Sequence, residues 1–200
     1  MSSSADNSPD SRPLLARLTA AMLTVSAVFE RQRVEYALIG GLSVAVRGNG
    51  RATEDADFLL HVPAIQLPRL LEAMVESGCT LDVMQGIRDW TEGGMLVVTG
   101  PGGVHVDCLK AVIPVFHRIL ERARPESFGE QTVRVADAEG LLLLKLIAFR
   151  PLDQEDIRGI LAANAEQLDL DWVRREASLA GLDAQRMGDF ESMVGEFYVA

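Results

Sequence analysis

The sequence predicts an α/β protein of the α+β kind, with a mixed first half and a helical second half. Up to about residue 136, short apolar runs that end at glycine pairs recur, a pattern typical of buried strands that end in tight turns. Beyond Asp137 the apolar residues recur at steps of three and four, which is the period of an amphipathic helix. We therefore expect a mixed sheet with flanking helices over 13–136 and a helical region packed on this core over 137–200, after a disordered polar tail over 1–12.

Helices and strands alternate in the first half. Leu14, Leu18 and Met22 begin a spaced apolar series that predicts a helix from Pro13 to about Arg33. Strands are then expected over 36–39, 55–62, 80–84, 95–99, 103–109 and 131–135. Shorter helices are expected between them over 42–46, 64–77 and 113–122. The helices of the second half are expected over 138–149, 153–165, 171–180 and 184–198.

Composition limits the class of protein and its partners. A chain of 200 residues with 48% hydrophobic and 24% charged residues can bury a full core, which excludes general disorder. The net charge of −10 disfavours a broad electrostatic grip on nucleic acid. The two cysteines form neither a zinc pattern nor a disulfide framework. The chain shows no secretory signal and no apolar run long enough to cross a membrane, so we expect a cytoplasmic protein without a membrane partner.

Acidic side chains lie in two of the predicted strands. Asp55 and Asp57 are two residues apart, so on a strand their carboxylates point to the same face and repel each other unless a cation lies between them. Asp107 lies in another strand, with His105 on the same side as a weaker candidate and Cys108 pointing to the core. Carboxylate oxygens suit Mg²⁺ or Mn²⁺, and such a site fits phosphoryl or nucleotidyl transfer.

A glycine pair precedes these acids. Gly40 and Gly41 end a strand and begin a predicted helix, where free backbone N–H groups and the helix dipole favour a phosphate. Ser43 adds a hydroxyl to this phosphate-binding turn. A simple turn is the alternative for the glycine pair taken alone. The chain has no G-x-x-x-x-G-K-[ST] motif, which excludes a P-loop.

The glycine pair, a gap of thirteen residues and then Asp55-Ala-Asp57-Phe resemble the signature of the polymerase-β-type nucleotidyltransferase superfamily. The run LIGGLSVAVRGNGRATEDADFLL is similar to its small bacterial branch of AbiEii-like, toxin–antitoxin-associated nucleotidyltransferases. In that branch an Arg and a Ser or Thr precede the acids, which matches Arg51 and Thr53 here. The resemblance implies a nucleotidyltransferase-like mixed sheet, with Asp107 as the third acid.

A second motif of the same branch lies in the helical half. A lysine, an alanine three residues later, an arginine and a D-x-x-D pair match Lys145, Ala148, Arg150, Asp153 and Asp156. Lys145 also stands out because the chain has 17 arginines and only two lysines, and a compact ammonium suits a triphosphate oxygen. The alternative is that Lys145 lies at the edge of an apolar helix with its amine in solvent. Asp153 and Asp156 are assigned to the site only on the resemblance, since pairing with Arg150 and Arg158 is the other interpretation.

These residues together predict a Mg-dependent nucleotidyltransferase that moves NMP from an NTP to an acceptor and releases pyrophosphate. Its acceptor could be RNA, a partner protein such as a cognate toxin or antitoxin, or a small molecule. Nucleic acid is not favoured, because the one local basic cluster, Arg118, Arg122 and Arg124, is diluted by Glu121 and Glu126. A non-catalytic antitoxin-like interaction protein on the same fold is the alternative.

Overall fold

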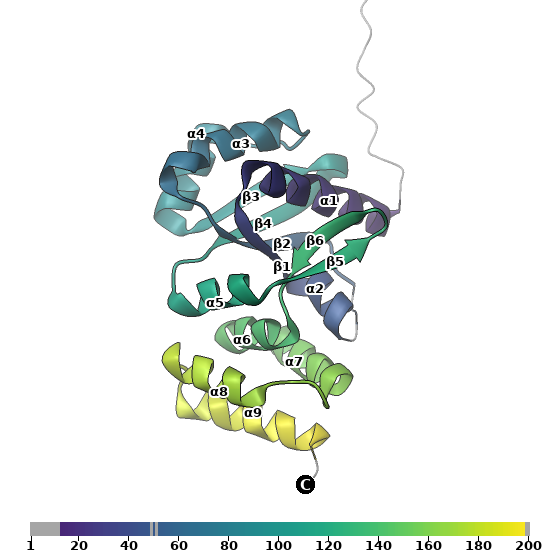
Figure 1. Cartoon of the computed structure of the whole chain (residues 1–200), viewed down its shortest axis with the longest axis vertical. Helices are drawn as coiled ribbons and strands as arrows, with labels where there is room; N and C mark the ends of the chain where they lie inside the picture. The colour runs from purple at the N-terminus through teal and green to yellow at the C-terminus, as the bar shows by residue number, and fades with distance from the viewer. Residues whose placement is uncertain (1–12, 49, 51, 199–200) are drawn as a thin grey trace, which may run out of the picture.

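The computed structural model describes residues 13–48, 50 and 52–198, and Arg51 therefore lies outside the described residues. A six-stranded mixed sheet lies in the middle of the molecule, with helices on both sides (Figure 1). The α-helices are α1 Leu14–Gln32, α2 Gly40–Arg47, α3 Leu67–Glu76, α4 Val83–Arg88, α5 Pro114–Arg122, α6 Ala138–Ala148, α7 Pro151–Asn164, α8 Leu170–Leu179 and α9 Ala184–Phe197. Short helical turns are η1 Ala64–Gln66, η2 Asp89–Gly93 and η3 Pro101–Gly103.

The strands lie in the order β3-β4-β2-β1-β6-β5. They are β1 Glu35–Ile39, β2 Asp55–His61, β3 Met95–Gly100, β4 Val104–Lys110, β5 Arg124–Phe128 and β6 Gln131–Val135. The pairs β2–β4 and β1–β6 are parallel, and the other neighbours are antiparallel. Asp57 pairs with Ile39 on one side and with Asp107 on the other, so this register fixes which residues share a face with the acids.

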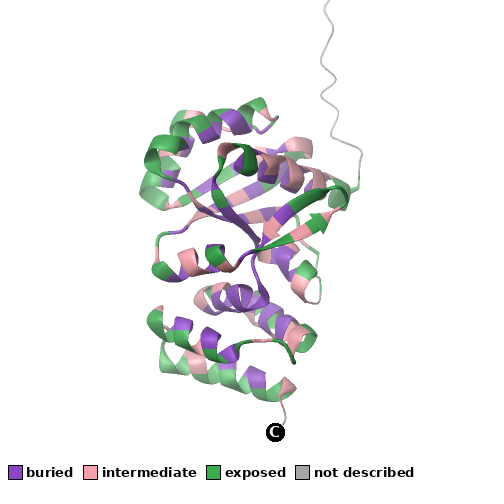
Figure 2. Cartoon of the chain, in the orientation of Figure 1, coloured by how far each residue is buried: buried purple, intermediate pink, exposed green. Residues whose placement is uncertain are grey.

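The two faces of the sheet contact different sets of helices (Figure 1). One face packs on α1, α3 and α4, with Phe29, Tyr36 and Phe58 in mutual ring contact. The opposite face, on which the acids lie, packs through Ile39 and Leu59 on α5 and the helical second half. The buried residues lie in the strands and on the sides of the helices that face other elements (Figure 2). The helices α5–α9 pack over β1 and β2 on this face. Asp55, Asp57 and Asp107 are only half-buried, so they lie at the edge of this helical layer.

Most of the predicted elements are present, and one prediction is wrong. The expected strand over 80–84 is absent: Thr80 makes a single bridge to Thr99, and the chain then enters α4. The physical reason is Asp82, whose carboxylate accepts a hydrogen bond from the Gln85 backbone N–H at 2.8 Å and so caps the helix. β5 was not expected from the sequence. The segment from Met95 to Lys110 forms the β3–β4 hairpin, whose strands are joined by the short turn η3.

Within the described residues, none of the helices is long and apolar enough to cross a bilayer.

Candidate active site

The three predicted acids converge. Asp55 and Asp57 project from β2, and Asp107 projects from the parallel strand β4 in register with Asp57. Each of the three offers an oxygen, and these oxygens lie within 4.8 Å of one another in half-buried positions. They are the one group of this kind in the part of the chain that the structure describes. His105, the cross-strand partner of Asp55, is exposed and does not belong to the group.

The proximity of the carboxylates has an electrostatic cost. Burial, followed by the carboxylates of Asp55 and Asp107, raises the pKa of Asp57 to about 6. Lys145 and the backbone N–H of Gly41 oppose this rise. Burial and Asp55 also raise the pKa of Asp107. A site that concentrates three carboxylates in this way favours a bound cation.

The glycine pair lies directly against the acid-bearing strand. Gly40 has φ +68, and a Cβ atom at this position would overlap the carboxylate of Asp57. A Cβ atom on Gly41 would lie 2.7 Å from Oγ1 of Thr53. The backbone N–H of Gly41 acts to lower the pKa of Asp57, so the first turn of α2 faces the acids. Both glycines are therefore required by the local packing, whether or not a phosphate binds there.

The two hydroxyl residues predicted for the site have different surroundings. Thr53 donates from Oγ1 to Oδ1 of Asp55 at 2.8 Å and orients that carboxylate. Ser43 is fully buried, and its Oγ donates to the carbonyl oxygen of Gly40 at 2.8 Å. The structure therefore brings Thr53 to the acids, whereas the hydroxyl of Ser43 is engaged within its own helix. A phosphate contact of Ser43 stays a prediction.

Lys145 is buried and has two carboxylate partners. Its Nζ lies 2.7 Å from Oδ2 of Asp156 and 3.1 Å from Oδ1 of Asp153, so it does not lie with its amine in solvent. Asp153 also accepts hydrogen bonds from the backbone N–H and the guanidinium of Arg150, at 2.9 and 2.7 Å. Burial opposes ionisation, but the hydrogen bonds from Arg150 and Lys145 outweigh it and lower the pKa of Asp153. The pairing of Asp153 with Arg150 that the alternative expected is therefore present, and Arg158 forms an ion pair with Glu196.

Lys145, Arg150, Asp153 and Asp156 form a group of ion pairs. Helix-capping residues determine where the two helices that carry this group begin. Asp137 accepts the N–H of Gly140 and begins α6, which carries Lys145. Asp153 accepts the N–H of Arg150 at the start of α7. A pocket of about 160 Å³ separates this group from Asp57. Its lining residues are Ile39, Gly40, Asp57, Leu109, Leu141, Leu144, Lys145, Ala148, Arg150 and Asp153.

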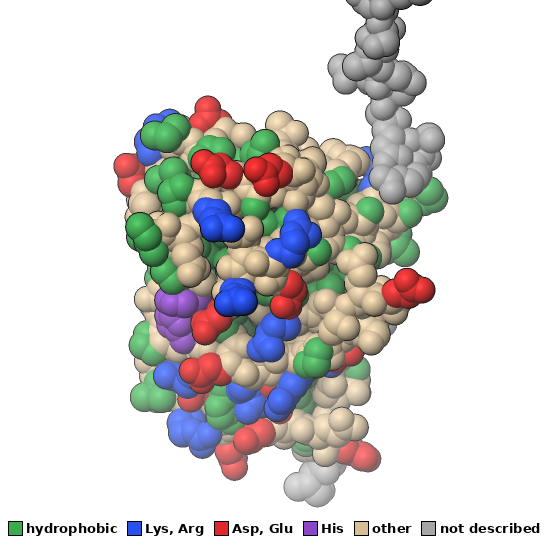
Figure 3. All heavy atoms as spheres, turned by 45° about the horizontal axis from the view of Figure 1, so that its top comes forward, with side chains coloured by type: hydrophobic (Ala, Val, Ile, Leu, Met, Phe, Trp, Pro, Cys, Tyr) green, Lys and Arg blue, Asp and Glu red, His purple; other side chains and the backbone are tan. Residues whose placement is uncertain are grey.

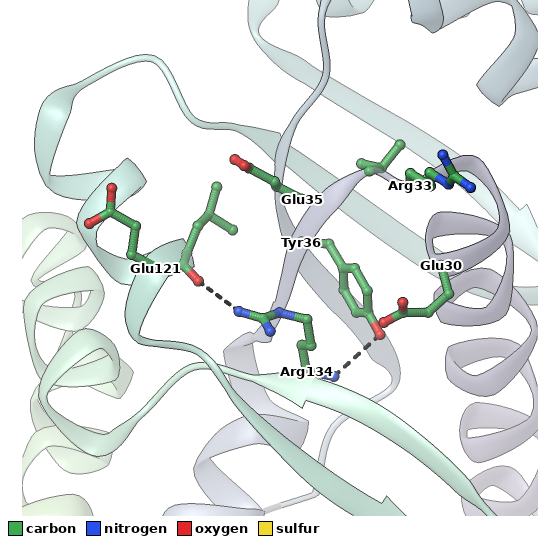
Figure 4. A pocket seen from close by; sticks show the side chains of 8 residues that line it. Glu30, Arg33, Glu35, Tyr36, Glu121 and Arg134 are labelled. Atoms are coloured by element: carbon green, nitrogen blue, oxygen red, sulfur yellow. Dashed lines mark hydrogen bonds between the residues drawn. The ribbon is translucent and has the colours of Figure 1, made fainter.

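A pocket at the far end of β1 does not contain the predicted site residues (Figure 4). There the Tyr36 hydroxyl accepts the backbone N–H of Arg134 at 3.3 Å, and burial raises the pKa of Tyr36 to about 12. The guanidinium of Arg134 donates to the carbonyl oxygens of Leu120 and Ala123. These polar groups satisfy one another and support the fold at this end of the sheet.

Two of the three arginines of the predicted basic cluster form ion pairs with neighbouring acids. Arg118 pairs with Glu176, and Arg122 pairs with Asp137. On the face that Figure 3 displays, acidic and basic side chains are interspersed, without a continuous basic stripe. The described surface in this view therefore gives no support to an extended nucleic-acid interface.

Comparisons with known proteins find one matching family model and several solved structures that superpose on this chain. The family model "nucleotidyl transferase of unknown function (DUF2204)" matches residues 19–187. An antigenic nucleotidyltransferase-like protein from Paracoccidioides brasiliensis superposes with a TM-score of 0.51 at 17% identity, over 92% of this chain and 94% of the other. JHP933 from Helicobacter pylori gives 0.48 at 14% identity, over 92% and 91%. The antibiotic-resistance factor ANT(2'')-Ia gives 0.45 at 15% identity, over 92% of both chains. The comparison with curated proteins finds no match.

Proposed function

The chain belongs to the family of nucleotidyl transferases of unknown function, and we propose that it transfers NMP from an NTP to an acceptor and releases pyrophosphate. The observation that carries this proposal is the convergence of Asp55, Asp57 and Asp107 beside the first turn of α2. Nucleotidyl transfer needs a cation-binding group next to a place for the triphosphate, and this arrangement supplies both.

The donor set fits Mg²⁺ or Mn²⁺. All three ligands are carboxylates, which these ions prefer over imidazole or thiolate. A divalent ion, when bound, would neutralise phosphate charge and activate the incoming nucleophile. Asp55 and Asp57 would hold the metal, and Thr53 would keep Asp55 oriented. Asp107 would hold a second ion or take the proton of the acceptor group.

The triphosphate would bind between α2 and α6. The backbone N–H groups of Gly40 and Gly41 provide donors at the N-terminus of α2, next to Asp57. On the other side of the pocket Lys145 and Arg150 provide positive charge. Lys145 is held by Asp153 and Asp156, so in this proposal those acids position the ammonium rather than bind a metal.

A thermal-shift titration tests the proposal. Each NTP is added with Mg²⁺ or with EDTA to the wild type and to Asp57→Asn, and Asp189→Asn in α9, an exposed position, serves as the matched control. A ligand at about 100 times its Kd stabilises a protein by about 2.7 kcal/mol. We expect a Mg-dependent shift with at least one NTP, retained in Asp189→Asn and lost in Asp57→Asn.

If no NTP produces a shift, the alternative of a non-catalytic, antitoxin-like interaction protein is favoured. If an NTP does produce the shift, the acceptor is sought with that NTP labelled at the α-phosphate. Transfer of the label to RNA, to a partner protein such as a toxin or antitoxin, or to a small molecule distinguishes the three acceptor classes. The charge of −10 favours the latter two over RNA.

A further inference from the structure

The outer edge of β3 has unpaired backbone groups. β3 is the last strand of the sheet, and only β4 pairs along its length. Thr99 exchanges both of its backbone hydrogen bonds with Thr80, at 2.7 and 3.1 Å, on the side away from β4. Backbone groups alternate in direction along a strand, so Val97 and Met95 also direct their N–H and C=O groups outward. Within the described chain, no backbone hydrogen bond reaches these outward groups.

A groove of about 660 Å³ runs along this edge. Met95 and Val97 form one wall, and their side chains are 45% and 51% exposed. Residues of α4 and η2 form the opposite wall, namely Gln85, Arg88, Asp89, Glu92 and Gly93. β3 contains neither a charged residue nor a proline, which are the usual means of protecting a free edge from pairing. Free backbone groups beside exposed apolar side chains are the features to which an added strand binds.

We propose that this groove docks an extended, basic segment of a partner protein, which pairs with Met95 and Val97 as an additional strand. The bridge between Thr80 and Thr99 already shows that the edge accepts an antiparallel neighbour at the adjoining position. The opposite wall has two carboxylates, Asp89 and Glu92, against one guanidinium, Arg88, which donates to the neutral side chain of Gln85 at 2.6 Å.

The negative charge of the protein favours a basic partner segment over a second copy of the chain as the occupant of the groove. Edge-to-edge pairing of two copies would bring two acidic walls together in a protein of net charge −10. A basic segment instead meets complementary charge from Asp89 and Glu92 on the wall opposite β3. Val97 is directly opposite Asp107 in the sheet, so the docked segment would lie one strand beyond the acids. The docking itself does not depend on nucleotidyl transfer.

The test selects binders from a displayed library of random seven-residue peptides with the full-length protein. Val97→Pro removes one outward N–H and leaves the β3–β4 hydrogen bonds intact, because proline is tolerated where the N–H faces away from the sheet. Val97→Thr keeps the N–H and is the matched control. We expect selected peptides rich in Lys and Arg, with Kd values at least about tenfold higher for Val97→Pro and unchanged for Val97→Thr.

Backbone N-methylation of a selected peptide provides a second measurement on the wild-type protein. Methyl groups should abolish binding at alternate positions only, since half of the N–H groups of an added strand face β3. Glu92→Lys should weaken binding, and Glu72→Lys, exposed on α3, should not. Three results would overturn the proposal: no enriched peptide, binding that does not respond to Val97→Pro or to N-methylation, or a self-association that Val97→Pro abolishes.

Discussion

Gly40 and Asp57 are in such close contact that no side chain fits between them. Gly40 has φ +68, and a Cβ atom there would overlap the carboxylate that the Gly41 N–H also contacts. Two motifs separated along the chain are thus parts of one packing arrangement, in which the β1–α2 turn supports the acid on β2. This contact explains a glycine at position 40 on steric grounds alone.

Gly40→Ala is therefore expected to destabilise the protein. The left-handed backbone alone costs an alanine about 1–2 kcal/mol, and displacement of Asp57 adds to this. Chemical denaturation measures the loss, and the Mg-dependent NTP shift should decrease with it. Gly188→Ala in α9 is the control, because its Cβ meets open space at an ordinary helical φ. Equal stability of the two variants would contradict the contact.

The metal-free protein is expected to lose stability as the pH rises from about 4 to about 6. Burial and the neighbouring carboxylates raise the pKa of Asp57 from 3.8 to about 6, so in this window the folded state holds a proton that the unfolded state has released. The contribution of this proton to the free energy of unfolding is complete below pH 3.8, the pKa in the unfolded state. It is lost as the pH rises through about 6, the pKa in the folded state. Asp57→Asn should remove this component, which is on the order of 3 kcal/mol. Urea denaturation in EDTA at several pH values measures the difference, and parallel curves for the two proteins would refute it.

The fold follows from the sequence wherever apolar periodicity is strong. The helices around Leu18 and Leu142 and the strand around Phe58 have clear patterns and are present. β5 has no such signal, because Arg124–Phe128 is polar and mostly exposed and owes its strand form to pairing with β6. The segment 80–84 contains a local helix signal, since Asp82 and Gln85 have the spacing of a helix N-terminus and begin α4.

The sequence predicts the three acids of the candidate site, but it does not predict the ion pairs that join its helices. Asp55 and Asp57 are found from strand alternation, and the parallel register then places Asp107 beside them. The link of Lys145 to Asp156 joins two helices at an angle that sequence spacing does not determine. The groove beside β3 is likewise a tertiary feature, because residues of α4 and η2 form the wall opposite Met95 and Val97.

Thr53→Val tests whether the site depends on the orientation of Asp55. The substitution keeps the shape of the side chain but removes the hydroxyl that donates to Asp55 at 2.8 Å. Loss of such a supporting hydrogen bond typically weakens metal binding 10–100-fold, so we expect Mg²⁺ affinity to fall in that range. Mn²⁺ titration followed by electron paramagnetic resonance measures it. Thr91→Val is the control, as its hydroxyl bonds only within its own turn of helix. Unchanged affinity in Thr53→Val would assign the threonine a purely structural role against Gly41.

Lys145→Met is expected to be among the most destabilising substitutions in the helical half. It leaves Asp153 and Asp156 buried while their shared cation is removed, and breaking a buried pair in this way costs about 3–5 kcal/mol. The double variant Lys145→Met, Asp156→Asn should recover part of the loss, because one of the two buried carboxylates is replaced by a neutral amide. Thermal and urea unfolding of the single and double variants give the coupling. Lys110→Met, the other lysine of the chain, is the control, since its Nζ forms no ion pair within the described residues and lies 3.4 Å from the Trp90 carbonyl and 5.9 Å from the centre of the Trp90 ring. If Lys145→Met unfolds no more easily than Lys110→Met, the ion pairs contribute nothing to the α6–α7 packing. Lys145 would then act on the triphosphate alone.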